Sequence, residues 1–299
     1  MGDSFVFSAR FQNNIIILVD GLAPDEPQTA RWLHDSFRDL AYSVTLPKIE
    51  RSKVQSVAEL IELLKTVRER CATDGLKPIL HFEAHGSEEV IAVANGAMNW
   101  TDLIPHLREI YLASGGNLGI VMSTCHGFHA LKPIKIKTAT PFTFLMGSQD
   151  EITVGQIRSN MILFYRELFS TGDLESAMAM VDSTFRQYNS ERFFARTIGT
   201  VIRRNGIGHL RERRIRQALA FASYAALPRD RRRKLYWAAK EHTRPSKKMF
   251  DRYADVFLPC GHSIDVRQLV VFIWGNYSKK FSYERQRLAP PPRLGHQLF

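Results

Sequence analysis

Residues 79–86 read ILHFEAHG, and residues 119–127 read GIVMSTCHG. Each stretch begins as a run of apolar side chains, which is typical of a strand buried on both faces of a sheet. The first run ends on His85-Gly86, and the second ends on Cys125 with Gly127 two positions later. We therefore expect two buried strands that each end on a reactive side chain followed by a glycine.

Further apolar runs indicate that these two strands belong to a larger sheet. NNIIILVD (13–20) is another buried-strand pattern and ends at Asp20-Gly21, and PFTFLMGS (141–148) predicts one more strand. A short strand is expected near 42–47, ending at Pro47, and a small extended piece over 89–96.

Helical spacing of apolar residues separates the strands. Helices are expected over about 27–40, from a capping box at Ser56 and Glu59 onward, and from Asn99 to about 113 with an early break at Pro105. From 153 onward the pattern is helical, with one helix through Leu168 and a second from Leu174 to Phe185.

The alternation of strand and helix predicts an α/β fold. Its simplest form is a three-layer α/β/α sandwich with a mainly parallel sheet covered on both faces. In such sheets ligands bind beyond the carboxyl ends of the strands. Asp20, His85 and Cys125 all lie at expected carboxyl ends, so a functional site is predicted at that rim.

Composition adds a location and a second region. The apolar runs are too short to span a bilayer, no secretory signal pattern opens the chain, and three cysteines suit a reducing compartment. We expect a cytoplasmic protein with no membrane partner.

The formal charge of +11 is unevenly distributed along the chain, because residues 203–252 hold 16 Lys and Arg against 4 Asp and Glu.

This charge pattern predicts two parts, a domain over 1–190 and a basic, mostly helical extension over 191–299 with a loosely ordered tail. The basic region 203–252 is expected to contact an acidic regulator or nucleic acid. RERRIR and RDRRRK suit phosphate contacts, and Tyr236 and Trp237 could stack on bases, although no nucleic-acid-reading motif is present. Solvated helix faces are the alternative interpretation.

The two strand ends have a chemical interpretation as a pair. A thiol is a useful nucleophile as a thiolate, and a neighbouring imidazole is the usual means of lowering its pKa. If the two strands are neighbours, His85 and Cys125 face one another at the edge of the sheet. A glycine after each lets the backbone turn sharply and leaves N–H groups free for an oxyanion.

The order of these features along the chain resembles the caspase-like (clan CD) cysteine peptidases, and within them the CHAT branch. The features are, in order, strand–His85-Gly86, the extended piece, Trp100, strand–Cys125-x-Gly127 and PFTFLMGSQD before a helix. The resemblance covers about residues 13–185. Thr124 departs from the alanine of the caspase cysteine signature. The resemblance implies that Cys125 attacks a peptide carbonyl, that His85 is the acid–base partner, and that the N–H groups of Gly86 and Cys125 form the oxyanion hole.

The resemblance also implies a protein substrate, no cofactor, and a role in bacterial defence or regulated cell death. Relatives that cut after Arg or Lys line their first pocket with acidic residues, at the position of Asp20 and at that of Ser123. Because Ser123 is not acidic, Glu83 and Asp150 are further expected substrate-binding residues. Cleavage after a basic residue follows as a hypothesis.

Two other interpretations remain open. His81, Glu83 and His85 alternate onto one strand face, and Cys125, His126 and His129 are further potential metal ligands, but their spacing matches no zinc motif. No metal is therefore expected. The other alternative is a catalytically inactive caspase-like scaffold whose basic C-terminal helices bind nucleic acid or an acidic partner.

Overall fold

The computed structural model describes residues 12–205, 208–221, 224–242, 247–265 and 269. Its α/β part is built on a six-stranded sheet in the order β2-β1-β3-β7-β8-β9, parallel except where β9 pairs with β8. The strands are β1 (Ile15–Asp20), β2 (Lys48–Lys53), β3 (Pro78–Glu83), β7 (Gly119–Ser123), β8 (Phe144–Ser148) and β9 (Phe185–Asn189). Every residue of β1, β3, β7 and β8 is buried, as their continuous apolar runs predict.

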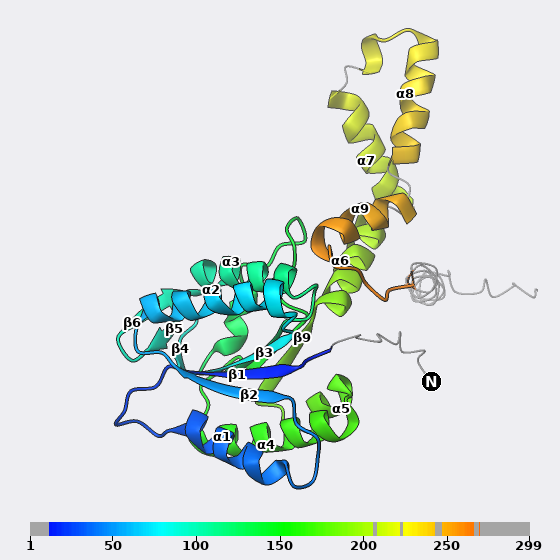
Figure 1. Ribbon diagram of the computed structural model, residues 1–299. Coiled ribbons are helices and arrows are strands. Elements are labelled where there is room, and N and C mark those ends of the chain that lie inside the picture. Colours follow the sequence, from blue (N-terminus) through cyan, green and yellow to red (C-terminus); the bar gives the residue numbers. More distant parts are fainter. Residues whose placement is uncertain (1–11, 206–207, 222–223, 243–246, 266–268, 270–299) are drawn as a thin grey trace, which may run out of the picture. The chain divides into compact units, whose positions relative to one another are not determined.

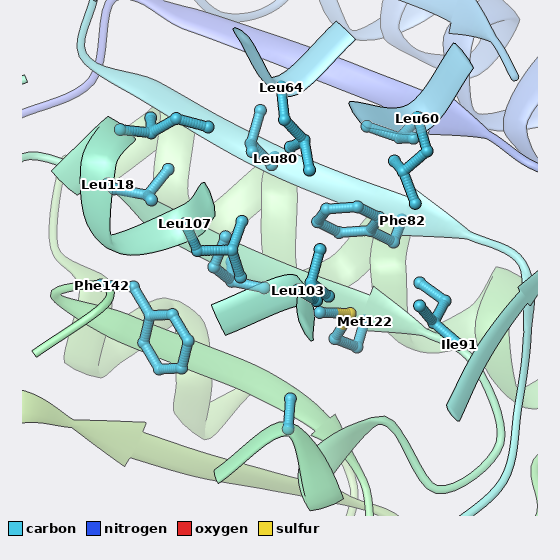
Figure 2. Packing of buried hydrophobic residues seen from close by; sticks show 14 of the residues in the cluster. Leu60, Leu64, Leu80, Phe82, Ile91, Leu103, Leu107, Leu118, Met122 and Phe142 are labelled. Atoms are coloured by element: carbon cyan, nitrogen blue, oxygen red, sulfur yellow. The ribbon is translucent and has the colours of Figure 1, made fainter. Parts of the chain in front are cut away.

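Helices cover both faces of this sheet (Figure 1). One face packs against α2 (Val57–Asp74) and α3 (Trp100–Ala113), and the other against α1 (Thr29–Leu40), α4 (Val154–Thr171) and α5 (Leu174–Ala179). Alternate side chains of a strand enter different cores. Leu80 and Phe82 of β3 pack with α2 and α3 (Figure 2), whereas Ile79 packs on the opposite face. The fold is the expected three-layer sandwich.

A second, three-stranded sheet continues from the carboxyl end of β3. β4 (His85–Gly86) pairs antiparallel with β5 (Val90–Val93), and β5 pairs with β6 (Gly96–Asn99). This sheet contains the extended piece expected over 89–96. The indole Nε1–H of Trp100 donates to the carbonyl of Ser87 at 3.1 Å, which ties the start of α3 to the turn after His85.

The helix signals have mixed outcomes. Ser56 caps α2 as expected, because its hydroxyl accepts the Glu59 N–H at 3.2 Å, and Gly75 ends the helix with φ 66°. The expected break at Pro105 is wrong, since α3 runs through that residue. A proline this near the N-terminus removes only the bond to the Thr101 carbonyl and leaves the later turns intact.

Both edge strands differ from the expectation. The strand expected at 42–47 is wrong: residues 41–43 form a turn, and β2 begins after Pro47. The sequence of β2 is KIERSK, which is rich in charge. An edge strand can carry such side chains because it pairs with a neighbour on one side only. The helix expected to reach Phe185 ends at Ala179, and Phe185 begins the antiparallel β9.

The remaining described elements are helical. They are α6 (Ser190–Asn205), α7 (Gly208–Phe221), the 3₁₀ turn η2 (Tyr224–Ala226), α8 (Arg229–His242) and α9 (Lys247–Phe257). Pro228 lies between η2 and α8. The loosely ordered tail expected at the end of the extension lies outside the described residues.

The described chain divides into two compact units, an α/β unit of 12–194 with 251–263, and a helical unit that includes 195–250. Hydrogen bonds explain why 251–263 belongs to the first. The Thr140 N–H donates to the Phe257 carbonyl at 2.8 Å, and the Ser263 N–H donates to Glu191 at 2.7 Å. A domain boundary at 190 remains a prediction.

Candidate active site

The candidate site lies at the carboxyl ends of β1, β3 and β7. In the register of these parallel strands Asp20 pairs with Glu83, and Glu83 pairs with Ser123. By alternation the three side chains belong to the face covered by α1 and α4. His85 and Cys125 each follow two residues later, where the strands have ended. The fold thus brings five of the expected residues to one rim of the sheet.

The segments that carry His85 and Cys125 are in backbone contact. A Cβ atom on Gly86 would lie 2.3 Å from the Cys125 carbonyl oxygen, so a side chain there would push the two segments apart. A Cβ atom on Gly127 would lie 2.5 Å from Cβ of Met122 and 2.6 Å from Oγ1 of Thr124. Close packing therefore requires both glycines that follow the reactive residues.

Cys125 occupies a tight turn between β7 and the 3₁₀ helix η1 (Gly127–Leu131). His126, the next residue, has φ 55° and ψ 17°, and within the described ranges it alone combines a side chain with a positive φ. Its N–H donates to the Asp150 carbonyl at 3.0 Å, which helps to hold this conformation. Left-handed backbone at a non-glycine residue costs about 1–2 kcal/mol and is often found at functional sites.

Cys125 is a half-buried residue, and its sulfur contacts the loop that follows β8. The Ile152 N–H donates to Sγ at 3.4 Å, and the Ile152 carbonyl oxygen lies 3.8 Å from Sγ. A backbone N–H is a donor of the kind that a thiolate accepts. The thiol is thus oriented by backbone groups of Ile152, within a residue that is only partly buried.

His85 has a carboxylate partner that the sequence analysis did not identify. Its side chain is 60% exposed, and Nε2 is hydrogen-bonded to Oε1 of Glu26 in the loop between β1 and α1. The other oxygen of Glu26 accepts the Ala23 N–H at 2.6 Å. The Ala23 N–H, followed by the bond to His85, holds the pKa of Glu26 below its usual value, so this group is a carboxylate at neutral pH.

A second set of contacts ties the two reactive segments together. Glu88, in the turn after His85-Gly86, accepts a hydrogen bond from Nζ of Lys132 at 2.9 Å. Nζ of Lys132 also donates to the Glu88 carbonyl at 3.2 Å. Lys132 directly follows η1, so this exposed ion pair links the segment after His85 to the segment after Cys125. The hydrogen bond from Lys132 lowers the pKa of Glu88.

Asp20 is fully buried at the end of β1 and forms an ion pair with Arg51 of β2. Nη2 and Nε of Arg51 donate to Oδ2 of Asp20 at 2.6 Å and 3.0 Å. Oδ1 of Asp20 is buried and has no hydrogen-bond partner among the described residues. Buried polar atoms are normally paired, so an unpaired carboxylate oxygen at this strand end is unusual.

Glu83 and Ser123 belong to a buried hydrogen-bond network. The ring of His81 bonds through Nε2 to Glu83 at 2.9 Å and to Ser123 at 3.0 Å. Nδ1 of His81 bonds to the Tyr165 hydroxyl at 2.8 Å, and Thr29 donates to Glu83 at 2.5 Å. Burial raises the pKa of Tyr165 well above its usual value, so this phenol stays neutral. In this arrangement Glu83 and Ser123 are occupied in holding the sheet against α1 and α4.

Asp150 differs from these buried groups because it is exposed. It follows β8, and its carbonyl accepts the His126 N–H described above, which brings its backbone next to the turn of Cys125. Its carboxylate therefore lies at the same rim and is accessible. Among the four expected substrate-binding residues, Asp150 is exposed, whereas Asp20, Glu83 and Ser123 are buried.

The remaining cysteines lie away from this rim. Cys71 is buried in α2, and burial raises the pKa of its thiol to about 11. Cys260 lies in the segment 251–263, where burial also raises the pKa of the thiol.

Within the described residues no three His, Cys, Asp or Glu side chains are grouped to hold a metal ion. No helix in that part of the chain is both long enough and apolar enough to cross a membrane.

Two residues of the site were missed. Glu26 lies in APDEPQ, directly after the carboxyl end of β1, so the rule that selected His85 and Cys125 also covers this loop. The sequence analysis could not identify Arg51, because its strand was assigned to the wrong residues.

No protein-family model and no curated protein sequence matches this chain.

Proposed function

We propose that the protein is a cysteine endopeptidase in which Cys125 is the nucleophile and His85 the acid–base residue. One observation carries the proposal. Gly86 packs directly on the Cys125 carbonyl, so the segments that carry His85 and Cys125 lie side by side. A histidine with an exposed ring and a half-buried cysteine thus follow adjacent strands, at the rim where α/β sheets bind ligands.

The proposed reaction uses these groups in order. Sγ of Cys125 gives its proton to His85 and attacks the peptide carbonyl carbon. The C–N bond then breaks, and His85 protonates the leaving amine. Water, deprotonated by His85, hydrolyses the thioester and restores the thiol. The backbone N–H groups of Gly86 and Cys125 are the proposed oxyanion donors, each worth about 3–4 kcal/mol in comparable sites.

In this mechanism Glu26 is a positioning residue. It binds Nε2 of His85, which leaves Nδ1 as the ring nitrogen that exchanges protons with the sulfur and the leaving amine. An ionised carboxylate on the far side of the ring fixes the tautomer and stabilises the imidazolium that forms during the reaction.

Labelling with a peptide chloromethylketone that carries arginine at the reactive end tests the proposal. Mass spectrometry of the digested protein should find the probe on Cys125 and not on Cys260, although Cys260 is the more exposed residue. Cys260→Ala is the matched control and should keep both labelling and peptide cleavage, whereas Cys125→Ala should lose both. Equal labelling of the two cysteines, with no cleavage by the wild type, would overturn the proposal.

The proposed preference for a basic cleavage-site residue depends on Asp20. Its unpaired Oδ1 supports it, although Arg51 already balances part of the charge. Asp20→Asn removes both the carboxylate and its ion pair with Arg51. Arg51→Gln removes the same ion pair but keeps the carboxylate of Asp20. The first variant should lose the preference for arginine over alanine substrates, and the second should keep it. Parallel behaviour of both variants would reject Asp20 as the specificity residue.

A further inference from the structure

The helical unit contains a hairpin with a strongly basic surface. α7 and α8 run antiparallel and are joined through η2 (Figure 1), and Nη2 of Arg211 near the start of α7 donates to the Lys240 carbonyl near the end of α8. Residues 208–242 contain ten Lys and Arg and three Asp and Glu. Eight of the ten are arginine. This excess of positive charge is confined to about 35 residues.

Packing directs these cations outward. Ile215 and Leu219 form the buried side of α7, with exposed fractions of 0% and 6%. The exposed side chains include Arg213, Arg214, Arg216, Arg229, Arg231, Arg233 and Lys234. Within the described residues none of these seven is in an ion pair with a carboxylate. Their charge therefore remains available to an external anion.

The hairpin also presents an aromatic ring beside this charge. Trp237 is 56% exposed, and it lines a surface hollow with Asp230, Arg233 and Lys234, at the spacing of one helix face. Nζ of Lys240 lies 4.9 Å from the centre of the Trp237 ring. A second hollow, on α7, is lined by Arg213, Arg216 and Gln217 among others. Both hollows combine cations with hydrogen-bond donors.

We propose that the α7–α8 hairpin binds single-stranded nucleic acid, with arginines on the phosphates and Trp237 stacked on a base. Arginine offers phosphate a planar pair of donors, and an exposed tryptophan next to cations suits a base that has left a duplex. A membrane-bound helix requires a broad apolar face, and Trp237 is the exposed large apolar side chain of the described hairpin. This activity is independent of the proposed peptidase chemistry.

Fluorescence anisotropy tests this proposal with full-length Cys125→Ala protein and a labelled oligothymidylate of about 20 nucleotides. The hairpin variant carries four substitutions: Arg213→Gln, Arg216→Gln, Arg233→Gln and Lys234→Gln. The matched control loses the same charge from exposed positions of the α/β unit: Arg31→Gln, Arg38→Gln, Arg166→Gln and Lys65→Gln. Both proteins keep the same net charge, so a difference between them reports on the hairpin.

The parent should bind with an affinity that falls steeply between about 50 and about 200 mM salt. The hairpin variant should bind about 100-fold more weakly, with a salt slope smaller by about 3, since each phosphate contact contributes about 0.7. The control should bind like the parent. Equal binding by the hairpin variant and the control would overturn the proposal, because the charge would then act without regard to position.

Trp237 provides an independent readout. Trp237→Ala should weaken binding about tenfold and leave the salt slope unchanged, because stacking involves no counterion. Binding of the single strand should quench tryptophan fluorescence in the parent and not in Trp237→Phe. Tighter binding to a duplex of equal length, to phosphatidylserine vesicles or to polyglutamate would each overturn the assignment of a single-stranded ligand.

Discussion

His81 and His85 lie four residues apart in the chain and each bonds to a carboxylate, but the two pairs differ almost completely in exposure. His81 and Glu83 are on β3 and are 0% and 1% exposed, whereas His85 and Glu26 lie just beyond the strand and are 60% and 29% exposed. The bonded groups are the same. The difference arises because β3 ends at Glu83, so the next histidine leaves the layer between sheet and helices.

The polar atoms of the two pairs are also used differently. Both ring nitrogens of His81 are engaged, by Tyr165 on one side and by Glu83 and Ser123 on the other. His85 uses Nε2 for Glu26, and its Nδ1 has no partner in the part of the chain that the structure describes. A fully bonded buried pair maintains structure, whereas a half-bonded exposed pair can still transfer a proton.

The largest expected effect separates the two histidines by activity. His85→Ala should lower kcat/KM for a peptide substrate about a thousandfold, because general acid–base catalysis is lost, and should change the free energy of unfolding by less than about 0.5 kcal/mol. Urea denaturation and initial rates on the same preparation measure both quantities. A His85→Ala enzyme with more than about a tenth of the wild-type rate would contradict the assignment.

Stability should report on the buried pair. Glu83→Leu should lower the free energy of unfolding by about 3 kcal/mol, because it leaves the ring of His81 and the hydroxyl of Thr29 without their shared partner in the interior. Glu26→Leu is the matched control, in which the exposed histidine can bond to water and the loss should stay below about 1 kcal/mol. Equal losses in the two variants would mean that burial does not distinguish the pairs.

The same burial contrast explains how much of the fold was predictable. β1, β3, β7 and β8 are buried on both faces, so their apolar runs were visible in the sequence and predicted the sandwich. β2 and β9 were missed because edge strands need no such run. Because β2 was not predicted, Arg51 was not identified either, and its ion pair with Asp20 was not foreseen.

Strand alternation predicted the positions of the site residues better than their surroundings. It assigned Glu83 and His85 to one face, and that rule ends where the strand ends, at Glu83. Whether Glu83 meets solvent or a histidine depends on Thr29 and His81, whose positions follow from tertiary packing. Glu26 was missed for a similar reason, since its contact with His85 joins residues 59 positions apart.

A smaller effect is expected when Glu26 is altered without removing its shape. Glu26→Gln should lower kcat about tenfold with little change in KM, because the amide still contacts the ring but no longer stabilises an imidazolium. Glu88→Gln is the control, since it removes a nearby carboxylate that binds Lys132 and not His85. A parallel loss in both variants would assign the effect to the local charge instead of to orientation of His85.

The smallest effect is the pH dependence of stability that Glu26 contributes. Its pKa is lowered in the folded protein, so the wild type should exceed Glu26→Gln in free energy of unfolding above about pH 4.5. That advantage should shrink as the pH falls through the lowered pKa and should stay below about 0.5 kcal/mol, because solvent screens the pair. Glu50, whose pKa Arg70 lowers to about 2, is the reference: the advantage of wild type over Glu50→Gln should persist to more acid pH. Urea titrations between about pH 3 and about pH 6 can compare the two variants directly. If the Glu26 advantage grew on acidification, the carboxylate would be favouring its protonated form, and the proposed support of an imidazolium at His85 would fail.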